Sequence, residues 1–189
     1  MTATFRTSQP GWVADPSVPH LILVGLPGAG KSTVGAMLAE QLKRGFLDFD
    51  HEIERREGAT IAALFGQRGE EYFRAKEREL TEELRLVGNM ILSPGGGWIT
   101  NPDVVALLRP PGRIIYLRVR PETAIKRLGP ERATRPLLMR PDPLGELRRL
   151  LQERESLYQA ADHVIDTDRL SAQQVMTKVA ELATARGGR

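Results

Sequence analysis

A glycine-rich segment early in the chain has the residue types and spacing that bind phosphate groups. Residues 25–32 read Gly-Leu-Pro-Gly-Ala-Gly-Lys-Ser and fit the pattern G-x-x-x-x-G-K-[ST] in full, at the end of an apolar run. In this pattern backbone N–H groups wrap around phosphate oxygens, the lysine bridges the terminal phosphates and the serine ligates Mg²⁺. The segment, called the phosphate loop here, predicts nucleotide binding by Gly28, Ala29, Gly30, Lys31, Ser32 and Thr33.

Two aspartates lie in the second apolar segment, FLDFD at 46–50. Alternation along a strand would put the carboxylates of Asp48 and Asp50 on one side and Phe49 on the other. Beside a phosphate loop, one carboxylate can help hold Mg²⁺ and the other can accept a proton from an alcohol that attacks the γ-phosphate. An isolated Asp-x-Asp is more often a solvated strand end, but the neighbouring phosphate loop favours the catalytic interpretation.

A triple glycine and several arginines extend the set of binding candidates. Gly95, Gly96 and Gly97 follow a third apolar segment, and a turn without side chains lets a ligand contact backbone N–H groups. Arginine binds a carboxylate or phosphate through two parallel hydrogen bonds, but most arginines in any protein are solvated. The candidates among them are Arg74, Arg127, Arg135 and Arg154.

The order of apolar and helical patterns predicts the fold class. Short strands are expected at 20–25, 46–50, 89–93, 113–119 and 163–166, with helical patterns between them. This alternation predicts an α/β fold with a parallel, doubly wound sheet and helices on both faces, which binds ligands at the carboxyl ends of its strands. The stretch at 128–144, with four prolines and three arginines, interrupts the pattern and is a candidate lid.

Composition excludes several other classes of protein. The 189 residues suit one domain, and a net charge of +3 is too small to indicate nucleic-acid binding. The absence of cysteine excludes disulfides and thiolate metal sites. No apolar run is long enough to span a membrane, and residues 1–19 do not resemble a secretory signal. We expect a flexible extension at 1–19, a single domain at 20–189 and a cytoplasmic location.

The motifs together resemble the shikimate kinases. GLPGAGKST, FLDFD, EYFRAKE, SPGGG, TRPLL and ERESLY occur in the same order and at similar spacing, over about residues 20–185. The phosphate loop alone is shared with many kinases, whereas the whole set is much more specific. The resemblance implies a P-loop NTPase fold with a five-stranded parallel sheet in the order 2-3-1-4-5. It also implies Mg²⁺-dependent transfer of the γ-phosphate of ATP to the 3-hydroxyl of shikimate, a step of aromatic amino-acid biosynthesis.

The resemblance also assigns roles on the acceptor side. Asp50 would contact the shikimate hydroxyls and act as the base, and Arg74 and Arg154 would bind the carboxylate. The triple glycine, with Gly96 at its centre, would contact shikimate through the backbone, and Glu77 would hold Arg74 in place.

On the nucleotide side, Ser32 would ligate Mg²⁺ directly, with Asp48 near the metal. Lys31 and the lid residue Arg135 would contact the transferring phosphate, and Arg127 would lie beside adenine.

Two positions depart from the family pattern. Leu170 stands where relatives often have a basic residue near adenine, and Arg169 is a potential substitute. Trp98 follows the triple glycine, where many relatives have a smaller residue. It would either narrow the acceptor pocket or pack below it.

Three alternatives remain at this stage. The chain could phosphorylate another small acceptor, such as gluconate or a nucleoside monophosphate. It could be a non-catalytic module that senses ATP or a metabolite, although such a module should lose Asp50 or Arg135, and both are present. Nucleic-acid binding is unsupported, because no basic helix is evident. The expected partners are ATP and shikimate, without nucleic acid or membrane, and we expect a monomer.

Overall fold

The central strand of the sheet is the apolar run that precedes the phosphate loop. The computed structural model describes residues 12–129, 138–139 and 141–184. In it β1 (Leu21–Val24) pairs in parallel with β3 (Met90–Ser93) on one side and with β4 (Arg113–Arg118) on the other. β2 (Gly45–Asp48) and β5 (His163–Asp166) form the two edges. The five-stranded parallel sheet has the order β2-β3-β1-β4-β5, which confirms the expected order.

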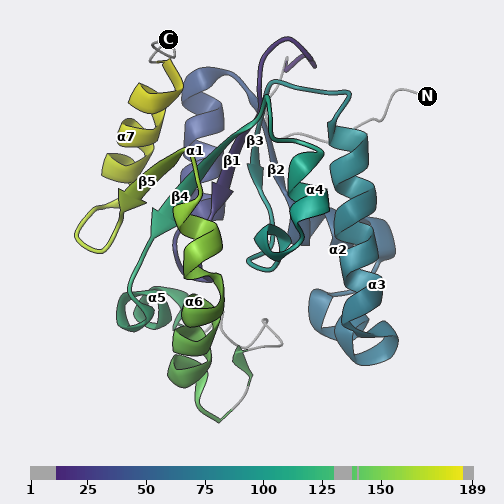
Figure 1. Cartoon of the computed structure of the whole chain (residues 1–189), viewed down its shortest axis with the longest axis vertical. Helices are drawn as coiled ribbons and strands as arrows, with labels where there is room; N and C mark the ends of the chain where they lie inside the picture. Colours follow the sequence, from purple (N-terminus) through teal and green to yellow (C-terminus); the bar gives the residue numbers. More distant parts are fainter. Residues whose placement is uncertain (1–11, 130–137, 140, 185–189) are drawn as a thin grey trace.

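Helices cover both faces of this sheet, as the alternating pattern predicted (Figure 1). One group consists of α1 (Lys31–Leu42) and α7 (Ala172–Thr184), which pack against each other. The others are α2 (Phe49–Glu57), α3 (Ile61–Leu84), the short η1 (Trp98–Thr100), α4 (Pro102–Ala106), α5 (Pro121–Leu128) and α6 (Pro143–Gln159). α3 is broken by the non-helical backbone of Gly69. None of the helices in the described part of the chain is long and apolar enough to cross a membrane.

Alternation along the strands divides the interior into two cores. In β1, Leu21 and Leu23 face a core shared with α1 and α7, whereas Ile22 and Val24 face a core shared with α3 and α4. All four residues are buried, because a parallel sheet with helices on both faces leaves neither face to water. Packing in these two cores therefore fixes the strands in place. Because the strands are parallel, their carboxyl ends and the loops that follow them all lie at the same end of the sheet.

The second strand is shorter than the sequence pattern indicated. β2 ends at Asp48, and Phe49 and Asp50 already belong to α2. Asp48 is the N-cap of that helix and accepts a hydrogen bond from the His51 N–H at 3.3 Å. Strand alternation between Asp48 and Asp50 is therefore the wrong description. The capping carboxylate ends the strand, because aspartate at an N-cap satisfies a free backbone donor.

The segment at 12–19 lies against the domain. The Trp12 indole donates to the Asn89 carbonyl at 2.9 Å, and the Asn89 N–H donates to the Val18 carbonyl at 2.8 Å. Most of the expected lid, residues 130–137 and 140, lies outside the described residues, as do residues 1–11.

Candidate active site

The phosphate loop connects β1 to α1 in a conformation that requires glycine. Gly28 has a φ of +83°, and a Cβ there would lie 2.5 Å from the Ala124 carbonyl oxygen of α5. Gly30, with a φ of +92°, is the N-cap of α1, and no side chain caps the N–H groups of the first turn. A helix N-terminus with its positive dipole end is suited to binding an anion.

A cavity of about 440 Å³ opens at this loop and is lined by residues 28–34, Arg127 and the start of α7. Arg127 donates to the Thr167 hydroxyl at 3.1 Å and to the Thr167 carbonyl at 2.6 Å, which fixes the arginine at the rim. Leu170 lines the same cavity, whereas Arg169 lines a separate one. At position 170, where relatives often have a basic residue, the apolar side chain of Leu170 therefore faces the candidate nucleotide cavity.

Ser32 and Asp48 are in contact between the start of α1 and the end of β2. The Ser32 hydroxyl donates to Asp48 Oδ2 at 2.5 Å, and both side chains are half-buried. Ser93, which pairs with Asp48 in the sheet, is buried, and its hydroxyl has no partner in the described structure. Within the described ranges, no cluster of three His, Cys, Asp or Glu side chains could hold a metal alone. These oxygens suit Mg²⁺, which takes few protein ligands and completes its shell with phosphate and water.

A second cavity, of about 560 Å³, adjoins the phosphate loop at Pro27. Asp50, Arg74, Arg154 and the triple glycine all line it, so the structure brings together these expected acceptor residues from four segments of the chain. The apolar residues that line it are Ile61, Ala62, Phe65, Phe73, Leu138 and Leu150. An apolar lining together with a few charged groups suits a small ring compound that carries a carboxylate and hydroxyls.

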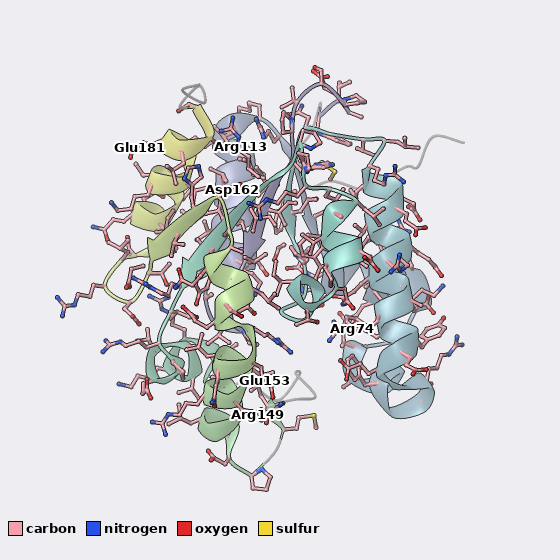
Figure 2. The ribbon with its side chains drawn as sticks, viewed as in Figure 1. Arg74, Arg113, Arg149, Glu153, Asp162 and Glu181 are labelled. Carbon is pink, nitrogen blue, oxygen red and sulfur yellow. The ribbon has the colours of Figure 1, made fainter. Side chains whose placement is uncertain are left out.

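Arg74 is fixed by two acidic residues of its own helix. Its guanidinium donates to Glu77 Oε2 at 2.5 Å and to Glu70 Oε1 at 2.8 Å, and Figure 2 shows its side chain on the inner side of α3. Glu77 is 2% exposed, and burial raises its pKa to about 7 against the opposing effect of Arg74. The second oxygen of Glu77 is buried and has no hydrogen-bond partner among the described residues.

Asp50 and Glu77 approach the triple glycine from one side. The position that a Cβ would take on Gly95 lies 2.8 Å from Glu77 Oε1 and 3.2 Å from Asp50 Oδ1. Two carboxylate oxygens therefore converge over a bare Cα. Side chains at this position would block the carboxylates, so the glycine keeps the space above it open to a ligand hydroxyl.

Arg154 on α6 is a charged side chain that is only 8% exposed. Among the described residues Arg154 forms no close ion pair, and Glu77 acts on it electrostatically without such a contact. A buried guanidinium without a close ion pair is costly, because its charge has lost water. The cavity in front of Arg154 is thus electrostatically suited to an anionic group.

Trp98 packs below the site. The residue is 0% exposed in the core beneath the triple glycine and does not line the acceptor cavity. Its indole N–H donates to the Thr81 hydroxyl at 3.1 Å. The large side chain therefore fills the interior between η1 and α3, which answers the question left open by the sequence. Arg135 lies outside the described residues.

Two features of the site were not found from the sequence. Ser93 follows an apolar strand like many structural serines, and only the pairing of β2 with β3 places it beside Asp48. Tyr158 donates to the Gly96 carbonyl at 3.0 Å across 62 residues of sequence. The available signal was its position one helical turn after Arg154, which puts both side chains on one face.

The parallel sheet, the phosphate loop and the adjoining cavity with its arginines and aspartate define a P-loop kinase that acts on a small molecule. The sequence model of the family described as shikimate kinase matches residues 27–184. A shikimate kinase of Chromohalobacter salexigens is 42% identical over 163 residues, which cover 86% of this chain and 90% of the relative. One of Pelotomaculum thermopropionicum is 39% identical over 160 residues, covering 85% and 92% respectively.

A solved structure described as shikimate kinase from Acinetobacter baumannii in complex with shikimate matches with a TM-score of 0.85 and 38% identity. The match covers 92% of this chain and 97% of the other. The chain belongs to the shikimate kinase family.

Proposed function

We propose that this enzyme transfers the γ-phosphate of ATP to the 3-hydroxyl of shikimate and releases ADP and shikimate 3-phosphate. The observation that carries the proposal is the cavity beside the phosphate loop, where Asp50, Arg74, Arg154 and the triple glycine meet. Two guanidinium groups suit the carboxylate of shikimate, and a carboxylate suits its hydroxyls. The family relatives, among them one solved with shikimate, support the same acceptor.

The proposed mechanism depends mainly on positioning and charge. Phosphoryl transfer passes through a transition state that needs an aligned acceptor and neutralised oxygens more than covalent help. Arg74 and Arg154 hold the acceptor carboxylate, so its reacting hydroxyl is directed at the phosphate loop. Asp50 orients that hydroxyl and takes its proton, and Lys31 neutralises the transferring phosphate.

Ser32 and Asp48 would hold Mg²⁺, which when bound to ATP neutralises phosphate charge. Arg135, on the proposed lid at about 128–144, would add positive charge as the lid closes and excludes water. Because such a contact forms mainly in the closed state, Arg135→Ala should lower turnover more than ATP affinity.

The decisive test is a coupled ADP-release assay with Mg²⁺ and a panel of acceptors: shikimate, quinate, gluconate and nucleoside monophosphates. Shikimate should give the highest kcat/KM, and NMR of the product should place the phosphate on the 3-hydroxyl. Faster phosphorylation of gluconate or a nucleotide would contradict the acceptor assignment and leave only the kinase class. ADP release that no acceptor stimulates would contradict the transferase itself.

A matched pair of variants on α6 links the activity to the cavity. Arg154→Ala should weaken shikimate binding by about 1.5–3 kcal/mol, because one charged partner of the carboxylate is lost. Arg149 on the same helix is exposed and paired with Glu146 at 2.5 Å and with Glu153, outside the cavity, and Figure 2 labels Arg149 and Glu153 close together. Arg149→Ala should therefore leave shikimate affinity unchanged in calorimetry. Equal effects of the two changes would argue against the carboxylate contact.

A further inference from the structure

The three carbonyl groups of the triple glycine are held in different ways. The Gly95 carbonyl accepts from the Trp98 N–H at 3.0 Å, and the Gly97 carbonyl accepts from the Thr100 N–H at 3.1 Å, so both bonds form within the local turn. The Gly96 carbonyl instead accepts from the Tyr158 hydroxyl of α6 at 3.0 Å. The central peptide group is thus oriented by a distant side chain, which matters because glycine itself restricts the backbone little.

The same hydroxyl lies close to Arg154. Arg154 lies four residues before Tyr158 on the same face of α6, and its charge acts on the Tyr158 phenol. A guanidinium can only donate, and a hydroxyl that donates to Gly96 can still accept, so the two groups are chemically suited to each other. The position that a Cβ would take on Gly96 is 3.2 Å from Arg154 Nη1 and 3.7 Å from the Tyr158 hydroxyl. Arginine, tyrosine and glycine therefore meet at one point.

Tyr158 is itself held rigidly. Its ring is fully buried and stacks on Tyr116 of β4, with ring centroids 4.9 Å apart and planes inclined by 19°. Tyr116 in turn donates to Glu155 of α6 at 2.9 Å. Burial raises the pKa of the Tyr158 phenol, so the group stays protonated and remains a donor at neutral pH. Its hydroxyl therefore occupies a fixed place relative to the sheet.

From this geometry we propose that Tyr158 is a positioning residue for the acceptor: its hydroxyl couples the orientation of Arg154 to that of the central peptide of the triple glycine. The C=O and N–H of a trans peptide point in opposite directions. Fixing the Gly96 carbonyl toward Tyr158 therefore directs the Gly97 N–H to the opposite side. Tyr158 therefore fixes the positions of the Arg154 guanidinium and the Gly97 N–H relative to each other before the acceptor binds. The inference rests on the proposed function for the identity of that acceptor.

Tyr158→Phe tests the inference, because it removes the hydroxyl and keeps the ring that stacks on Tyr116. KM and the dissociation constant for shikimate should rise about tenfold, corresponding to the loss of one buried hydrogen-bonding group. ATP affinity should stay within about twofold, since the phosphate loop is untouched, and kcat should fall less than KM rises. In an Arg154→Ala background the same change should have a smaller effect on shikimate affinity than in the wild type, because only the orientation of the Gly96 peptide is then lost.

Tyr116→Phe is the matched control. It makes the same substitution on the stacked partner, whose hydroxyl donates to Glu155, whereas the Tyr158 hydroxyl donates to Gly96. It should leave shikimate KM unchanged even if it lowers stability. If both variants lose stability alike and neither changes shikimate KM, Tyr158 is merely structural and the proposal is wrong.

An NMR comparison of the full, ligand-free chain makes the test independent of the acceptor. The amide signal of Gly97 and the guanidinium signal of Arg154 should shift in Tyr158→Phe and not in Tyr116→Phe. Unchanged signals in Tyr158→Phe would overturn the proposal. If the wild-type enzyme does not phosphorylate shikimate, the proposed function fails, whereas this comparison still decides whether Tyr158 sets the two groups.

Discussion

The guanidinium group of Arg74 lies directly against the backbone of Gly97. The position that a Cβ would take on Gly97 is 2.6 Å from both Cζ and Nη1 of Arg74, closer than real Cβ contacts come. Arg74 is held in this place by its hydrogen bond to Glu77. Gly97 therefore has a second role beyond backbone contact with a ligand, because it leaves room for the arginine that faces the acceptor cavity.

Gly97→Ala should displace Arg74 from the cavity. The added methyl group would overlap the guanidinium, so we expect shikimate affinity to fall by about 1.5–3 kcal/mol while ATP affinity is unchanged. Titration calorimetry with each ligand measures both. Gly66→Ala is the control. This glycine lies on α3, the helix that carries Arg74, but it is exposed, with nothing within 4 Å of its Cβ position. Unaltered shikimate binding in Gly97→Ala would show that Arg74 does not need this place.

Asp50→Asn should separate proton transfer from binding. The substitution keeps the shape of the side chain and removes the charge that can accept a proton. Phosphoryl transfer should fall by roughly 10²–10⁴-fold if Asp50 is the general base, with ATP affinity intact. A smaller loss is expected for a loose transition state, because the alcohol then keeps its proton until late. Single-turnover kinetics measures the chemical step, and a near-normal rate would mean that another group, or none, takes the proton.

Trp98→Phe should lower stability without changing acceptor preference. The change removes the hydrogen bond to Thr81 and leaves a small void in a fully buried site. Together these effects should cost roughly 1–3 kcal/mol of unfolding free energy, measured by urea titration. The ratio of kcat/KM for shikimate and quinate should stay the same. A changed ratio in a fully stable variant would instead indicate that Trp98 shapes the acceptor pocket.

His20 should make the protein less stable in mild acid. The ring is buried, its Nε2 lies 3.0 Å from the Leu84 carbonyl, and its Nδ1 has no hydrogen-bond partner in the described structure. Burial lowers the pKa of His20 below its ordinary value of 6.5, and the charge of Arg44 lowers it further. The unfolded chain therefore binds more protons than the folded one below about pH 6.5, so stability present at neutral pH is lost as the pH falls through the folded pKa.

His20→Gln isolates this contribution, because glutamine can still donate to Leu84 and carries no titrating group. The unfolding free energy of the wild type, minus that of the variant, should decrease from about pH 8 to about pH 5. Urea titrations at several pH values give the difference. Parallel pH profiles for the two proteins would rule out His20 as the source of acid sensitivity.

The local elements of this protein follow from its sequence. The phosphate loop could be recognised from its spacing, because its function depends on backbone conformations that glycine allows within eight successive residues. The parallel sheet could be predicted from the alternation of short apolar runs with helical patterns. The boundary at Asp48 could not, since an Asp-Phe-Asp segment suits both a strand end and a helix N-terminus, and hydrogen bonding to His51 decides between them.

The acceptor cavity shows where sequence reasoning reaches its limit. Motif resemblance nominated Asp50, Arg74, Arg154 and the triple glycine, but only the packing of α3 and α6 against the sheet brings them around one space. The contact of Arg74 with Gly97 and the bond from Tyr158 to Gly96 join residues far apart in the chain. Sequence spacing determines which side chains share a strand, turn or helix face. Which distant groups meet depends on how those elements pack, so the tertiary structure alone decided how the arginines are held.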